Sequence, residues 1–173
     1  LDLYIAWKPS GKSREEFLHE AAKVPGIYVP SLYEVSYKED GTIAAMTPKY
    51  EDIPTKIKKQ VVTNMTEVVY PDKPVVPFIK VTQDRVVLEV QRGCIRGCRF
   101  CQAGMVYRPV REKHVERLKA LAMAMLKSTG HEEISLSSLS SSDYSQLEEL
   151  IDFLIEECNK KRVNISLPSL RID

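Results

Sequence analysis

The sequence of 173 residues lacks a long hydrophobic run, an excess of one charge and a signal-peptide pattern at its start. A membrane-spanning helix needs about 20 consecutive apolar residues, so no membrane partner is indicated and secretion is not expected. Lysine and arginine total 25 against 24 aspartate and glutamate, and this balance disfavours a strongly basic nucleic-acid-binding protein. With 43% hydrophobic residues the chain can bury a core, and we expect a globular, cytoplasmic protein.

Proline is concentrated in the first part of the chain, where seven of the 10 prolines lie between Pro25 and Pro77. Each proline fixes φ and removes a backbone donor, so a long helix or a central strand is not expected there. We expect a helix at 14–23 with a capping box from Ser13, strands at 27–37 and 42–46, and a short helix at 54–60. Residues 1–77 are therefore predicted to form a small α+β or extended linker region, the tail of an upstream domain.

From residue 78 onward, apolar runs with strand character alternate with helical patterns. In chain order we expect a strand at 85–90, a helix at 114–127 ended by Gly130, a strand at 134–139, a helix capped by Asp143 and bearing Tyr144 on its apolar stripe, and a strand at 163–167. This order predicts parallel strands joined by right-handed crossovers. About three strands are too few to close a barrel, so we expect residues 78–173 to be a truncated α/β domain within a longer protein.

Three of the 4 cysteines, Cys94, Cys98 and Cys101, form a C-x3-C-x2-C motif after the first predicted strand of this α/β region. An odd number of thiols without a secretory signal argues against disulfides, and a redox C-x2-C pair would leave Cys94 unused. An iron–sulfur cluster bound by three thiolates, with one iron left open, uses all three residues. A structural zinc site with His114 as fourth ligand is an alternative.

The stretch LEVQRGCIRGCRFCQAGMVYRPVR, residues 88–111, is followed by EEISLSSLSSSDY and ISLPSLRID. Together these segments resemble the radical S-adenosylmethionine (radical SAM) superfamily. They are most similar to uncharacterised bacterial radical SAM proteins that carry a cobalamin-binding-like region upstream of the barrel. The resemblance covers residues 25–173 and implies the first part of a partial (β/α)6 TIM-like barrel.

The resemblance also implies two cofactors, a four-iron four-sulfur [4Fe-4S] cluster and S-adenosylmethionine (SAM). By that likeness the cluster ligands are Cys94, Cys98 and Cys101, and the SAM-binding residues are Phe100, Ser137, Ser138, Ser140, Ser169 and Arg171. The three residues Ser137, Ser138 and Ser140 occupy the place of a Gly-Gly-Glu motif that binds the SAM amino group. Phe100 would shield the cluster beside the adenine.

The activity implied is that of a radical SAM enzyme, which reductively cleaves SAM to a 5′-deoxyadenosyl radical and abstracts hydrogen from a substrate that the sequence does not identify. The partners expected are that substrate and an electron donor such as a flavodoxin or ferredoxin, and the isolated fragment is expected to be inactive. A cobalamin domain would lie mostly before Leu1, and no Asp-x-His-x-x-Gly motif is present in this stretch.

Two other functions compete with this one: a zinc-binding interaction module, and an iron–sulfur electron-transfer protein without SAM chemistry. A group of basic residues around the cysteine motif has two interpretations, a solvated face or a counterweight to an anionic cluster, the SAM carboxylate or a substrate phosphate. Its members are Arg92, Arg96, Arg99, Arg108, Arg111 and Lys113.

Overall fold

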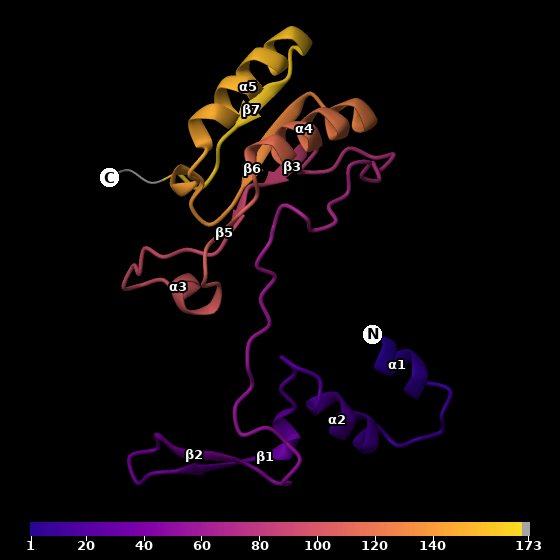
Figure 1. Cartoon of the computed structure of the whole chain (residues 1–173), viewed down its shortest axis with the longest axis vertical. Coiled ribbons are helices and arrows are strands. Elements are labelled where there is room, and N and C mark those ends of the chain that lie inside the picture. The colour runs from indigo at the N-terminus through magenta and orange to yellow at the C-terminus, as the bar shows by residue number, and fades with distance from the viewer. Residues whose placement is uncertain (171–173) are drawn as a thin grey trace. The chain divides into compact units, whose positions relative to one another are not determined.

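The computed structural model describes residues 1–170, in which the chain divides into two compact units, Leu1–Val61 and a second unit that begins at Val62 (Figure 1). This division comes earlier in the chain than the 77/78 boundary expected from the sequence. Residues 62–77 belong to the second unit because they bond to it along their length. Thr66 Oγ1 accepts from His114 N at 3.0 Å, and the Tyr70 hydroxyl donates to Val87 O at 3.0 Å.

The first unit contains two helices and a β-hairpin. Its elements are α1 (Asp2–Trp7), α2 (Arg14–Ala22), a 3-10 turn (Pro30–Leu32), β1 (Tyr33–Tyr37) and β2 (Ile43–Pro48), with β1 and β2 antiparallel. The capping box at Ser13 is confirmed, since Ser13 and Glu16 exchange hydrogen bonds. The prediction of a helix at 54–60 is wrong, because no helix forms in that segment. Ile57 is flanked by lysines, so the segment has no apolar stripe that a helix could bury.

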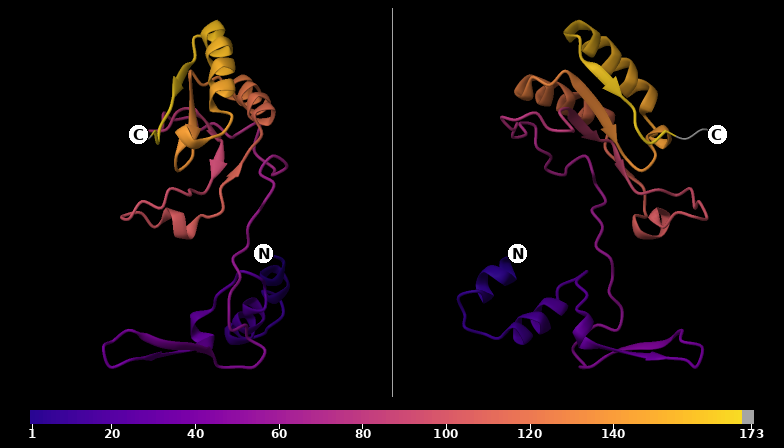
Figure 2. Two further views of the ribbon diagram at one scale, coloured as in Figure 1. Left: turned by 60° about the vertical axis from the view of Figure 1, so that its left-hand side comes forward. Right: turned by 180° about the vertical axis from the view of Figure 1, so that it is seen from behind.

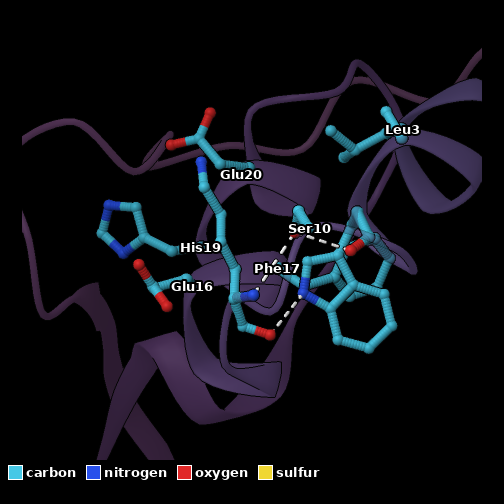
Figure 3. A pocket seen from close by; sticks show the side chains of 9 residues that line it. Leu3, Ser10, Glu16, Phe17, His19 and Glu20 are labelled. Atoms are coloured by element: carbon cyan, nitrogen blue, oxygen red, sulfur yellow. Dashed lines mark hydrogen bonds between the residues drawn. The ribbon is translucent and has the colours of Figure 1, made fainter.

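A small aromatic cluster holds α1 beside α2, and α1 was not expected from the sequence. The Trp7 ring lies 4.8 Å from that of Phe17 between centroids, and the indole NH donates to the carbonyls of Lys12 and Ser13. A cavity of about 320 Å³ opens here between Leu3, Phe17 and the polar side chains of α2 (Figure 3).

The second unit is built on a three-stranded parallel sheet in the order β3 (Val86–Glu89), β6 (Glu133–Ser137), β7 (Asn164–Ser166). Helix α4 (Val115–Thr129) connects β3 to β6, and α5 (Leu147–Lys161) connects β6 to β7 (Figures 1 and 2). The two helices pack against each other and against the sheet, and their apolar faces supply most of its core. The predicted α/β architecture, the first strands of a TIM-like barrel, is confirmed.

Local signals set the ends of α4 as expected. His114 is its N-cap, and Gly130 ends it in the left-handed conformation at φ 71°. The predicted start of the second helix is wrong. Asp143 lies in a 3-10 turn (Ser141–Asp143), Tyr144 follows that turn, and α5 begins only at Leu147. The Asp143 carboxylate is bound by Arg96, so it is not available to cap the helix.

Three short elements complete the unit: β4 (Gln91–Arg92) pairs antiparallel with β5 (Arg111–Glu112), and α3 (Ala103–Val106) lies between them. Within residues 1–170, every helix is too short or too polar to cross a bilayer.

Candidate cofactor-binding site

Two loops meet at the carboxyl end of the parallel sheet, the edge at which α/β barrels bind their ligands. The first, which we call the cysteine loop, comprises residues 93–102 and leads from β4 into α3. The second, the serine turn, comprises residues 138–145 and leads from β6 to α5. Both lie at the same end of the sheet in Figures 1 and 2. The topology therefore brings together two segments that are far apart in the sequence.

The three motif cysteines lie in the cysteine loop and are free thiols. Cys94 is half-buried, whereas Cys98 and Cys101 are exposed. No group of three His, Cys, Asp or Glu side chains among residues 1–170 is close enough to hold a metal ion. The ligand role of the three thiols therefore stays a prediction, supported by the chemistry of the set, because soft thiolates are the ligands of zinc and of iron–sulfur clusters.

Gly93 fixes the base of the cysteine loop. Its φ is 94°, and a Cβ atom there would lie 2.5 Å from Pro109 O and 2.6 Å from Tyr107 O. The chain returning from α3 thus passes directly against the start of the loop. A side chain at this position would push the two segments apart.

A cavity of about 460 Å³ lies beside Cys94. Residues of the segment 91–96 and of the serine turn 140–145 line it, together with Val110 and Glu112. Of the serines predicted to contact SAM, Ser140 lines this cavity, while Ser137 and Ser138 do not. The structure thus brings Cys94 and Ser140 to one cavity.

Two polar atoms of this wall are buried and have no hydrogen-bond partner, Ser140 Oγ and Gln91 Oε1. The amide of Gln91 donates through Nε2 to Ser140 O at 2.7 Å, which holds the two residues together. Buried acceptors without partners cost about 1–3 kcal/mol each, and a donor group bound nearby could offset that cost. Gln91 was missed from the sequence because a single polar residue at a strand end carries no periodic signal.

Two other predicted SAM contacts, Phe100 and Ser169, are not among the residues that line the cavity. The Phe100 side chain is 94% exposed in the cysteine loop. Ser169 has a φ of 60°, and its carbonyl accepts from Ser141 N at 3.0 Å, so the end of β7 contacts the serine turn. Arg171 lies outside the described residues. These three assignments stay predictions.

The basic residues around the motif do not form one solvated face. Arg92 pairs with Glu89 at 2.7 Å, and Arg96 pairs with Asp143. Lys113 is only 1% exposed, its Nζ lies 4.0 Å from the Tyr70 ring centroid, and it has no hydrogen-bond partner. Burial lowers the pKa of Lys113 below its ordinary value.

The serine turn is tied to the rest of the unit by one buried hydrogen bond and two exposed ones. The Tyr144 hydroxyl donates to Lys113 O at 2.8 Å, and burial raises the pKa of Tyr144, which keeps it a neutral donor. Ser145 N donates to Glu112 Oε1 at 3.0 Å, and Ser145 Oγ donates to the other oxygen of the same carboxylate. Neither Glu112 nor the Arg96–Asp143 pair was expected from the sequence.

The remaining candidate ligands have structural roles. His114 Nδ1 accepts from Glu116 N at 3.3 Å and so caps α4. Cys158, the fourth cysteine, is 1% exposed in the core of the second unit.

Comparison with known proteins bears on the same part of the chain. The model of the family described as the radical SAM superfamily matches residues 88–173. An uncharacterized protein of Methanocaldococcus jannaschii is 38% identical over 87 residues, which are 50% of this chain and 19% of that protein. The chain thus spans less than a fifth of the length of this curated relative. No solved structure is significantly similar to the chain.

Proposed function

Because residues 88–173 belong to the radical SAM superfamily, we propose that Cys94, Cys98 and Cys101 bind a [4Fe-4S] cluster and that SAM binds in the cavity beside Cys94. The superfamily is enzymatic, and its members use these two cofactors. The observation that carries the proposal is the position of the thiols, on one loop at the carboxyl end of a parallel sheet and next to a polar cavity.

Three thiolates leave one iron of the cluster without a protein ligand. With SAM bound at that iron, the reduced cluster would supply one electron to the sulfonium of SAM. The products would be methionine and a 5′-deoxyadenosyl radical, which would abstract hydrogen from the substrate. The contribution of this chain is to bind and orient. The exposed positions of Cys98 and Cys101 leave both thiols accessible to iron, and Cys94 borders the cavity.

The cavity wall offers what the amino-acid part of SAM requires. Ser140 Oγ and Gln91 Oε1 are acceptors for an ammonium group, and they take the place of the acidic residue of a Gly-Gly-Glu motif. The roles of Ser137, Ser138, Phe100, Ser169 and Arg171 are proposed from the family resemblance alone. A radical SAM protein also needs a reductant, and we propose an electron donor of the flavodoxin or ferredoxin type.

Anaerobic reconstitution with iron and sulfide, followed by metal analysis, tests the first step. We expect about four irons per chain and a broad absorbance at about 400 nm, which is typical of such clusters. Stoichiometric zinc without iron would instead support a structural zinc module. Reductive cleavage of SAM to 5′-deoxyadenosine tests the second step, because an electron carrier without SAM chemistry would hold the cluster and leave SAM intact.

The activity of the whole protein, its substrate and any use of cobalamin extend beyond this chain. Both assays should therefore use the full-length protein. A cobalamin-binding-like region upstream stays a prediction, which cobalamin binding by the full-length protein would test.

A further inference from the structure

One ion pair joins the cysteine loop to the serine turn. Arg96 Nε donates to Asp143 Oδ2 at 2.8 Å, and Arg96 Nη2 donates to Oδ1. Two parallel bonds from one guanidinium to one carboxylate fix orientation as well as distance. Arg96 lies between Cys94 and Cys98 in the sequence, so the pair acts directly on the backbone that carries two of the thiols.

The Asp143 side of this pair belongs to an ordered turn. Asp143 N donates to Ser140 O at 3.1 Å, and Ser141, fully buried, donates from its backbone N to Ser169 O. The Asp143 side chain is 19% exposed, against 41% for Arg96. The backbone of Asp143 is thus fixed within the serine turn, and Arg96 connects the cysteine loop to its carboxylate.

We propose that Arg96 and Asp143 form a clasp that fixes the first half of the cysteine loop against the serine turn, so that Cys94 and Cys98 are positioned for the cluster beside the SAM cavity. Asp143 is a positioning residue, because it contacts Arg96 and acts on the thiols through it. This inference rests on the proposed function, since it concerns retention of the same cluster.

Magnitudes separate this role from simple stabilisation of the fold. A partly exposed ion pair contributes little to folding stability. Residues that orient metal ligands from outside the coordination shell, in contrast, change metal affinity by about 10–100-fold when they are replaced. The clasp should therefore affect cluster retention much more than unfolding.

The test uses the full-length, reconstituted protein and measures iron release to a chelator, the electron paramagnetic resonance spectrum of the reduced cluster, and unfolding in urea. We expect Asp143→Asn and Arg96→Ala each to speed iron release roughly 10-fold. The double variant should be no faster than either single variant, because both remove the same contact. The exchanged pair, Arg96→Asp with Asp143→Arg, should recover part of the loss.

Arg85→Ala is the matched control, since it breaks another partly exposed arginine–carboxylate pair of the same unit, Arg85–Glu133, outside the cysteine loop, and its iron release should equal that of the unaltered protein. Equal release from the Asp143→Asn and unaltered proteins would overturn the clasp and leave the proposed function standing. Weaker SAM binding by Arg96→Ala but not by Asp143→Asn, measured by equilibrium dialysis, would also overturn the clasp, because Arg96 would then contact SAM itself. An unaltered protein that takes up no iron would overturn the proposed function, and the clasp with it.

Discussion

The two loops at the carboxyl end of the sheet are held in opposite ways. In the serine turn, Ser140 and Ser141 are buried, and the turn bonds to Ser169, which follows β7, and to Glu112 of β5. In the cysteine loop, Cys98, Phe100 and Cys101 are exposed, and a single backbone bond, Cys101 N to Cys98 O at 2.9 Å, is formed within it. The serine turn is held by buried groups, whereas the cysteine loop is held at its two ends, by Arg96, and by Arg108 Nη2, which donates to Ile95 O at 3.1 Å.

This difference indicates when each loop would meet the entropy cost of being ordered for binding. Ordering a residue costs about 1–2 kcal/mol in backbone entropy. The serine turn meets that cost during folding, although Ser140 Oγ is buried and would have to become accessible before it could accept from SAM. The cysteine loop would meet part of it on binding the cluster, when three thiolates converge on one centre. Loss of a thiol should therefore act on iron, and loss of a buried hydrogen bond in the serine turn should act on stability.

The largest expected effect comes from removing a thiol. Cys98→Ala, like Cys94→Ala or Cys101→Ala, should abolish the cluster, because two thiolates cannot complete the ligand set. Iron and sulfide analysis after reconstitution measures this loss. Cys158→Ala is the matched control: it removes a cysteine from the core, costs some stability and should keep all the iron. Unchanged iron and SAM binding in any of the three loop variants would sink the proposed site.

Several elements could be predicted because their signals are local. The capping box of Ser13, the Gly130 end of α4 and the β-branched run of β3 depend on residues close in sequence. The start of α5 could not, because the Asp143 side chain is bound by Arg96, 47 residues away. Likewise the two-residue pairing of β4 with β5 carries no periodic pattern.

The candidate site divides in the same way. The cysteine spacing pointed to the loop, and the position of the serines after a strand pointed to the turn. The residues that join the two, Gln91, Glu112 and Asp143, act through tertiary contacts that no local pattern encodes. The helix expected at 54–60 failed for a different reason: Ile57 packs against the core of the first unit, but one apolar residue does not give a helix an apolar face to bury.

The next effect concerns the base of the cysteine loop. Gly93→Ala should lower the free energy of unfolding by about 3 kcal/mol, because φ is positive and the new Cβ would collide with two backbone carbonyls. Urea unfolding measures this. Gly97→Ala is the control: φ there is also positive, but the space is open, so the cost should be about 1 kcal/mol. Equal costs at the two glycines would contradict the close approach at Gly93.

On the serine-turn side, Tyr144→Phe removes the hydroxyl that donates to Lys113 O. We expect a loss of about 1–2 kcal/mol in unfolding free energy, because a buried carbonyl is left without its donor, and no change in iron content. Tyr107→Phe, at an exposed tyrosine of the loop after α3, should leave stability unchanged. If Tyr144→Phe lost iron in proportion to stability, the buried Tyr144–Lys113 bond would also be needed to hold the cluster.

The smallest expected effect concerns Lys113, whose contribution to stability depends on pH. Lys113 is buried over Tyr70 without a hydrogen-bond partner, and burial makes its pKa lower in the folded chain than in the unfolded chain. Glu89 opposes this lowering of the pKa, and Arg92 and Arg117 add to it. Between the two pKa values the unfolded chain binds more protons, and stability due to this group therefore rises with pH.

Lys113→Met keeps the packing and removes the charge, so it should stabilise the unit by about 1 kcal/mol near pH 7. That advantage should shrink as pH rises toward the unfolded lysine pKa of about 10.4, because the lysine then becomes neutral in both states. Urea unfolding of both proteins across this range measures the difference, with Lys127→Met on the outer surface of α4 as control. An advantage that stayed constant with pH would mean that the pKa of Lys113 is the same in the folded and unfolded chains, and would contradict the lowering by burial.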